Sequence, residues 1–154
     1  EIDITSSIYC DTSLVWENIL TFYFRGRYSE PGRAVIKRSL DPISNYEEPI
    51  PFSIPAKNAF HFARLSGDTN GIHYNSPYAR MLGFKAAFAQ PVRTVAQCLN
   101  KFPFENRDLP ISLQLSYKGP VYYNQPLKML YNREGQFDLF IEGSDKPCVR
   151  GQLH

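Results

Sequence analysis

The feature that most restricts the fold is a single apolar helix pattern followed by a run of short strand patterns. Pro91 opens the helical segment and Pro103 ends it, since proline suits a first helical turn and disfavours the helix just before it. The apolar stripe consists of Val92, Val95, Ala96 and Leu99. Strands are predicted at residues 111–117, 127–131, 137–142 and 148–153. A helix followed by an antiparallel meander predicts an α+β fold, with the sheet wrapped round the helix.

The N-terminal part of the chain predicts a β-hairpin. Residues 2–8 alternate between apolar and polar side chains, and residues 15–25 are rich in β-branched and aromatic types, as strands are. Residues 11–13 (Asp-Thr-Ser) are expected to form the turn. Residues 26–55 hold five prolines, so we expect a connector there, interrupted by one short strand at 33–37.

Two shorter helices are predicted between the connector and Pro91. The first covers residues 56–66 and stops at Gly67, a residue that often ends helices. The second begins after Asn75, a favourable N-cap, and ends at Gly83.

The loop between these two helices carries a carboxylate and an imidazole. Asp68 and His73 are five residues apart, in a segment broken by Gly67 and Gly71. This spacing does not suit one face of a helix, whereas a glycine-rich loop can fold the two side chains toward one point. Both groups can move protons near neutral pH. We therefore predict an acid/base pair whose polar atoms lie close enough to share a water, with neither side chain in the core.

Composition excludes several other classes of protein. The three cysteines, at positions 10, 98 and 148, have no metal-ligand spacing, so no metal site is expected. Their odd number and wide separation predict free thiols in the cytoplasm. No apolar run approaches the ~20 residues of a membrane span, and no signal peptide is visible. The net charge is +2 with scattered basic residues, so no nucleic-acid partner is expected.

The chain resembles a known family over the loop and its flanks. The matching residues are Phe62, Ser66, Gly67, Asp68, Asn70, Ile72, His73, Ala79, Gly83 and Phe84. Together they resemble the hydratase motif of the MaoC-like dehydratases, the (R)-specific enoyl-CoA hydratases of hotdog fold. Gly71 stands where that family has proline.

The resemblance implies an architecture as well as a motif. Residues 51–154 would form the hotdog domain, and residues 1–50 a hairpin and linker. Residues 14–17 (Leu-Val-Trp-Glu) and 24–27 (Phe-Arg-Gly-Arg) look similar to the last hairpin of the first repeat in two-repeat members. The chain, which starts at Glu1 rather than methionine, would then be a piece of a longer protein. Pairing of two hotdogs is implied too, as a homodimer or a double-hotdog unit.

The same resemblance implies an activity, the reversible hydration of a 2-enoyl thioester carried by CoA or acyl carrier protein. Asp68 would activate water, His73 would share the acid/base work, and Asn70 would hold the loop. No cofactor is implied beyond the acyl-CoA substrate. Among the other candidates, His61 is expected to be a surface or packing histidine, and no Ser-His-Asp triad is evident.

One position departs from the family pattern where the thioester oxygen should be bound. The family has a glycine at the start of the central helix, whose N–H is the expected donor to that oxygen. Here Pro91 occupies the position, and proline has no N–H. The side chain of Gln90 and the N–H of Val92 remain as substitutes, and weak or altered activity is expected. The alternative is a non-catalytic hotdog that binds acyl thioester or serves as an assembly half. A thioesterase is a third, weaker option.

Overall fold

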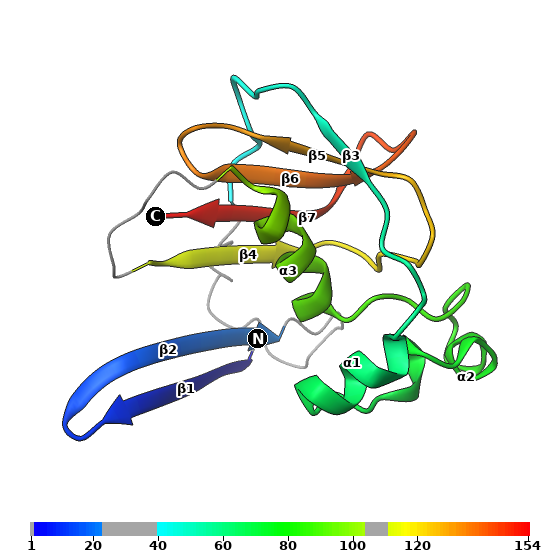
Figure 1. The fold of residues 1–154 in the computed structure, drawn as a ribbon, viewed down its shortest axis with the longest axis horizontal. Helices are drawn as coiled ribbons and strands as arrows, with labels where there is room; N and C mark the ends of the chain where they lie inside the picture. Colours follow the sequence, from blue (N-terminus) through cyan, green and yellow to red (C-terminus); the bar gives the residue numbers. More distant parts are fainter. Residues whose placement is uncertain (1, 23–39, 104–110) are drawn as a thin grey trace, which may run out of the picture. The chain divides into compact units, whose positions relative to one another are not determined.

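The computed structural model describes residues 2–22, 40–103 and 111–154 (Figure 1). The chain divides into two compact units, residues 1–38 and residues 39–154. The strand predicted at 33–37 lies outside the described residues.

The C-terminal unit is built on a five-stranded antiparallel sheet. Its strand order is β3-β5-β6-β7-β4. The strands are β3 (Ile50–Phe52), β4 (Leu113–Tyr117), β5 (Leu127–Tyr131), β6 (Gln136–Ile141) and β7 (Pro147–Leu153). The four predicted strands are confirmed, with ends that shift by a residue or two. The prediction missed β3, an edge strand in which Pro51 is tolerated because an edge strand leaves one row of N–H groups unpaired.

The helix α3 (Pro91–Lys101) packs against one face of this sheet (Figure 1). From the helix, Val95 and Cys98 are buried, as is Phe102 just after it. The sheet contributes Leu127, Met129, Phe137, Leu139 and Val149 to the same core. Burial of these side chains is the main stabilising term of the unit. The α+β architecture predicted from the sequence is thus confirmed.

The opposite face of the sheet carries a buried ion pair. Asp138 on β6 is opposite Arg150 on β7, and two hydrogen bonds of 2.8 Å join their side chains. Arg150 also donates to the carbonyl of Leu40 at 2.9 Å. The start of the unit is therefore fastened to the outer face of its sheet.

Short helices precede α3, and they position the candidate site. They are α1 (Ala59–Ser66), the 3₁₀ turn η1 (Gly71–His73) and α2 (Ser76–Met81). The helix α1 begins later than predicted, after Asn58 in the left-handed conformation (φ 65°). It stops at Gly67 (φ 74°) as predicted, since glycine adopts that conformation without strain. The predicted N-cap of α2 is also confirmed, because the Asn75 side chain accepts from the N–H of Tyr78.

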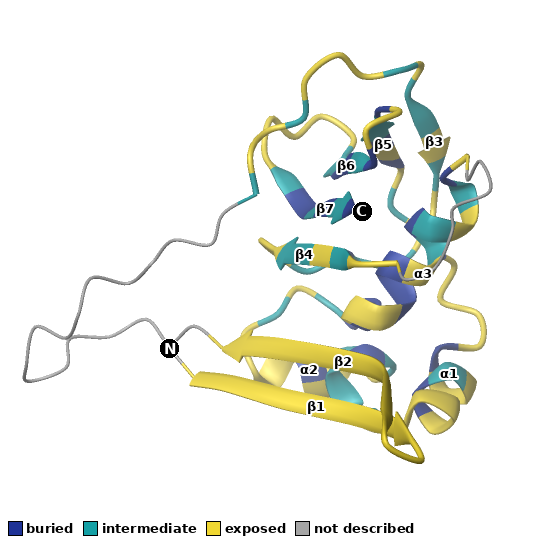
Figure 2. Ribbon diagram, turned by 90° about the vertical axis from the view of Figure 1, so that its left-hand side faces the viewer, coloured by how far each residue is buried: buried dark blue, intermediate teal, exposed yellow. Residues whose placement is uncertain are grey.

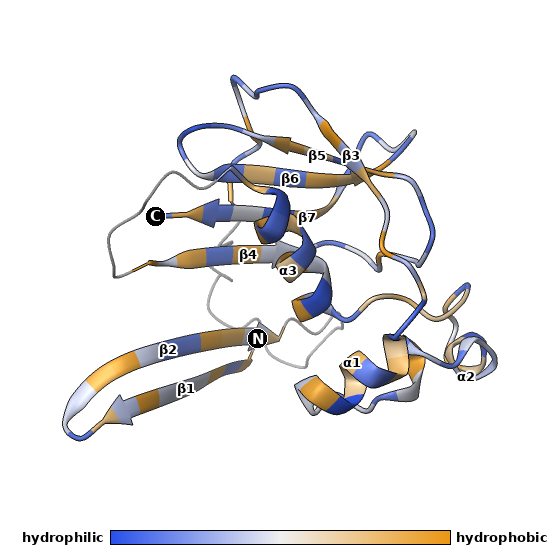
Figure 3. Ribbon diagram, viewed as in Figure 1, coloured by the Kyte–Doolittle hydropathy of each residue, from blue (hydrophilic) through white to orange (hydrophobic). Residues whose placement is uncertain are grey.

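The N-terminal unit contains the predicted hairpin. Its strands are β1 (Ile2–Cys10) and β2 (Ser13–Phe22), joined at Asp11 and Thr12. The cross-strand register places six large apolar side chains on one face: Ile2, Ile4, Ile8, Trp16, Leu20 and Phe22. These six residues form the hairpin apolar face. Each is between 42% and 55% exposed, and both strands are exposed throughout (Figure 2). Hydrophobic residues alternate with polar ones along them (Figure 3).

No helix in the described ranges is long and apolar enough to cross a membrane. The three cysteines are all free; Cys98 and Cys148 are buried and Cys10 is exposed. The core position predicted for Cys98 is confirmed, with no exposed surface.

Candidate active site

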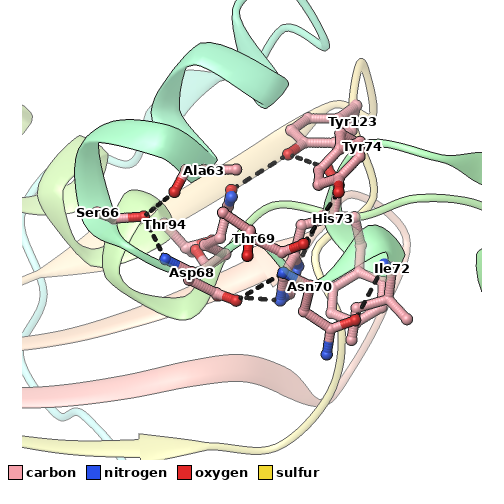
Figure 4. A network of polar contacts seen from close by, with 12 residues as sticks. Ala63, Ser66, Asp68, Thr69, Asn70, Ile72, His73, Tyr74, Thr94 and Tyr123 are labelled. Atoms are coloured by element: carbon pink, nitrogen blue, oxygen red, sulfur yellow. Dashed lines mark hydrogen bonds and ion pairs between the residues drawn. The ribbon is translucent and has the colours of Figure 1, made fainter.

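The loop between α1 and α2 is shaped by its own short polar side chains (Figure 4). The N–H of Asn70 donates to Asp68 Oδ1 at 3.3 Å, and the N–H of Ile72 donates to Asn70 Oδ1 at 3.3 Å. Two successive side-chain turns of this kind reverse the chain within a few residues. Gly71 lies close to a tyrosine ring, and a Cβ there would lie 2.8 Å from Tyr78 Cδ1, so a larger residue would force the exposed Tyr78 ring to shift. The loop-holding role predicted for Asn70 fits these contacts.

The turns bring the two predicted acid/base residues together. His73 Nε2 lies 3.3 Å from Asp68 Oδ2, with 41% of the Asp68 side chain exposed. Figure 4 shows the two side chains facing each other across the loop. The predicted convergence is therefore observed, although the catalytic roles stay predictions.

The predicted position of His73 outside the core is wrong. The residue is only 5% exposed, because its ring packs edge-on against Phe88 at a centroid distance of 4.8 Å. Its Nδ1 atom lies 3.0 Å from the Phe88 carbonyl oxygen. A carbonyl only accepts, so we assign the Nδ1 proton to this bond. With Nδ1 occupied by this bond, Nε2 is the ring nitrogen that faces the Asp68 carboxylate.

A tyrosine that the sequence did not single out also holds His73. The Tyr123 hydroxyl donates to the His73 carbonyl at 2.8 Å. Burial raises the pKa of Tyr123, although the charge and hydrogen bonding of Arg93 act to lower it. The guanidinium of Arg93 lies over the Tyr123 ring, 5.3 Å from its centroid. Tyr123 comes from a distant segment, so no local pattern could have revealed the contact.

The remaining predicted site residues separate into buried and exposed positions. Gln90 precedes α3 and is 1% exposed. Pro91 begins α3 and is exposed, and the Val92 side chain is 65% exposed. Of these side chains, only that of Gln90 reaches the His73 neighbourhood, through Tyr123 Oη at 3.5 Å from Gln90 Oε1.

An apolar groove of about 350 Å³ lies beside the start of α3. It is lined by Phe84, Phe88, Ala89, Pro91, Thr94, Tyr117, Lys118, Gly119, Pro120, Val121 and Val149. Neither Asp68 nor His73 lines it, but Phe88 connects the two regions, because this residue lines the groove and its ring packs against His73. The groove offers an apolar surface next to the polar pair. No cluster of three or more His, Cys, Asp or Glu side chains in the described ranges could hold a metal.

Comparison with known proteins identifies the fold. No family model and no curated protein matches the sequence. Among solved structures, HtdX from Mycobacterium tuberculosis superposes with a TM-score of 0.71 and 19% identity, covering 99% of this chain and 60% of its own. A MaoC-like dehydratase from Phytophthora capsici gives a TM-score of 0.64 and 19% identity, covering 97% of this chain and 56% of its own. The chain thus spans about three fifths of the length of these proteins.

A shorter protein is matched almost over its whole length by part of this chain. The (R)-hydratase from A. caviae superposes with a TM-score of 0.55 and 16% identity, and covers 75% of this chain and 96% of its own. These likenesses together define a hotdog protein. Its fold is that of the MaoC-like dehydratases and (R)-hydratases, so the resemblance seen in the sequence is confirmed at the level of the fold.

Proposed function

We propose that this chain catalyses the reversible hydration of a 2-enoyl thioester, with acyl-CoA or acyl carrier protein as the acyl carrier. The observation that carries the proposal is the Asp68–His73 pair, with 3.3 Å between Nε2 and Oδ2. The similar structures support it, since they include an (R)-hydratase and a MaoC-like dehydratase.

The chemistry needs one water and a returned proton. Water oxygen forms the bond to C3 of the enoyl group while Asp68 accepts a water proton, and the acid/base pair returns a proton to C2. The product is the 3-hydroxyacyl thioester, and the reverse sequence is dehydration. A positioned acid/base group of this kind contributes about 10²–10⁴ in rate.

The surroundings of the pair fit these roles. The bond from Nδ1 to Phe88 O fixes the ring and leaves Nε2 directed at Asp68. The partly exposed carboxylate can receive water, and the neighbouring groove could take an apolar acyl chain. Because Pro91 lacks the N–H that would meet the thioester oxygen, we propose that this contact is altered in this chain.

The test is the loss of enoyl-thioester absorbance when the chain is mixed with crotonyl-CoA or longer 2-enoyl-CoA substrates. We expect turnover by the wild type and a loss of at least ~10²-fold in Asp68→Asn. His61→Ala serves as the control, since His61 is an exposed histidine on α1. Absence of turnover at every chain length would refute the proposal.

One observation favours a second candidate function, that of an assembly half. The hairpin apolar face exposes six large side chains, and an isolated two-stranded hairpin is marginally stable in water. In the C-terminal unit, by contrast, the β5–β6 hairpin buries Leu127, Met129, Phe137 and Leu139 under α3. We infer that the hairpin apolar face is likewise covered by a second hotdog, in a homodimer or a double-hotdog unit.

The coverage of the similar structures supports this inference. The A. caviae hydratase is matched almost whole by 75% of this chain, whereas the longer HtdX chain matches 99% of it. A counterpart of the hairpin is therefore found within a protein that holds further chain. Assemblies among the similar structures include the ChsH1-ChsH2 complex. We also propose a cytoplasmic location, on the support of the three free thiols.

Sedimentation of the full chain tests the homodimer. We expect a dimer for the wild type and a monomer for Leu20→Asp, which places a charge on the hairpin apolar face. Thr5→Asp is the matched control, because Thr5 pairs with Ile19 on the other face of the hairpin, and it should leave the dimer intact. A monomeric wild type would contradict self-association.

A further inference from the structure

The guanidinium of Arg93 is buried in the first turn of α3 without an acidic partner. The residue is 8% exposed, and no ion pair within the described ranges includes it. Arginine stays charged inside proteins, and an unpaired buried charge costs free energy. A positive charge is also unfavourable near the N-terminus of a helix. Packing alone would be served better by an apolar side chain, so the contacts of Arg93 must offset this cost.

One set of contacts fastens the start of α1 to α3. The Nη2 atom of Arg93 donates to the carbonyls of Pro55 and Lys57, each at 3.0 Å. The guanidinium also lies over the ring of Phe62 within α1, 5.7 Å from its centroid. Because α1 has no side-chain cap at its own start, these contacts from α3 hold that end in place. Asp68 comes directly after the C-cap of α1, and its position therefore depends on how α1 is held.

A second set of contacts leads to the other member of the pair. The guanidinium of Arg93 lies 5.3 Å from the centroid of the Tyr123 ring, and the Tyr123 hydroxyl donates to the His73 carbonyl at 2.8 Å (Figure 4). Burial raises the pKa of Tyr123, and the charge and hydrogen bonding of Arg93 act against that rise. A cation beside a phenol polarises its O–H and makes it a stronger donor. Arg93 thus reinforces the anchor of His73.

We propose that Arg93 is the positioning residue of the proposed acid/base pair. A single guanidinium holds both α1, which leads into Asp68, and Tyr123, which anchors His73. It thereby maintains the distance of 3.3 Å between His73 Nε2 and Asp68 Oδ2. This role rests on the hydratase function proposed above. Arg93 does not line the apolar groove, so it acts through these neighbours, and a misplacement of ~1 Å transmitted to a catalytic group can cost about 10²-fold in rate.

Substitutions at Arg93 separate charge and hydrogen bonding from volume. Arg93→Met fills similar space without charge or donors, and should lower kcat by about 10²-fold while KM stays within ~3-fold of the wild type. Arg93→Lys keeps a cation that can donate to the two carbonyls, and should recover at least ~10-fold over Arg93→Met. Equal values for the two variants would show that Arg93 only fills space, and would overturn the proposal. Arg133→Met is the matched control and should leave kcat unchanged, since the Arg133 side chain is 87% exposed.

The route through Tyr123 is tested by a double-variant cycle. Tyr123→Phe keeps the ring beside Arg93 and removes only the hydroxyl, and should lower kcat by about 10-fold. Arg93→Met should then cost less in the Tyr123→Phe background than in the wild type, because part of its effect passes through that hydroxyl. Unconnected effects on the fold would multiply instead. Thermal melts establish that each variant is folded, and full kcat in folded Tyr123→Phe would overturn the proposal whether or not Arg93→Met folds.

A measurement without turnover follows the carbonyl of His73. Its ¹³C chemical shift in the substrate-free chain should move upfield when the hydrogen bond from Tyr123 is lost. We expect an upfield shift in Tyr123→Phe, a smaller one in the same direction in Arg93→Met, and none in Arg133→Met. Full kcat and an unmoved resonance in folded Arg93→Met would overturn the role of Arg93 and leave the hydratase function intact. No hydration by the wild type, with the resonance moving as expected in the variants, would refute only the proposed function.

Discussion

The two members of the proposed acid/base pair should respond unequally to substitution. Asp68→Asn and His73→Ala should each remove most of the proposed hydratase activity, but only His73→Ala should destabilise the fold strongly. The structural reason is the difference in burial, since His73 is 5% exposed while 41% of the Asp68 side chain is exposed.

The magnitude follows from the contacts that each change removes. His73→Ala deprives the buried Phe88 carbonyl of its donor at 3.0 Å, which costs about 1–3 kcal/mol. It also empties the space of a ring packed against Phe88, so the total loss is roughly 2–4 kcal/mol. Asp68→Asn preserves shape and changes only a half-exposed contact, so its cost should stay within ~1 kcal/mol.

Urea denaturation of the variants measures both values by linear extrapolation. His61→Ala is the matched histidine control and should lie within ~0.5 kcal/mol of the wild type, since His61 is exposed. The reasoning would be refuted if His73→Ala lost no more stability than Asp68→Asn. It would equally be refuted if either variant kept full activity.

Two further predictions concern the core. A Cβ on Gly151 would lie 2.2 Å from the buried Phe137 ring, so Gly151→Ala should lower the free energy of unfolding by about 1–3 kcal/mol or more. Gly119→Ala, with no described atom within 4 Å of the new Cβ, should change it by less than ~0.5 kcal/mol in the same denaturation assay; equal effects would contradict the packing described. Burial raises the pKa of Cys98 to about 12 and that of Cys148 to about 11, from the usual thiol value of 9.0. The folded chain then holds protons that the unfolded chain releases, so stability should fall as pH rises from about 9 to 12, by up to ~1.4 kcal/mol per pH unit for each thiol. Denaturation between pH 8 and 11 should show that the free energy of unfolding falls less steeply with pH in Cys98→Ala than in the wild type. The same pH dependence in both proteins would contradict this prediction.

Local signals predicted much of the fold. Gly67, Asn75 and Pro91 each mark a helix boundary through their own backbone chemistry, and each occupies the predicted place. The start of α1 was missed because Asn58 adopts a left-handed conformation without a side-chain cap. The strand β3 was missed because only its pairing with β5 makes so short a segment a strand.

The candidate site was predicted only in part, because some of its contacts are local in sequence and others join distant segments. The spacing of Asp68 and His73 and the polar turn residues between them are local features, and their convergence could be foreseen. The burial of His73 depends on Phe88, and its second anchor is Tyr123, fifty residues away in sequence. The contact of the Gln90 amide with Tyr123 likewise results from long-range packing. Contacts of this kind have no signature in a single sequence.

The central claim, that the Asp68–His73 pair adds water to an enoyl thioester, is tested most directly by following crotonyl-CoA in D₂O by NMR. The account predicts 3-hydroxybutyryl-CoA with one deuterium at C2 from the wild type, and no product above background from Asp68→Asn. Unchanged crotonyl-CoA would contradict the claim and favour a non-catalytic binding role. Release of free crotonate and CoA would contradict it as well, by showing thioester hydrolysis in place of hydration.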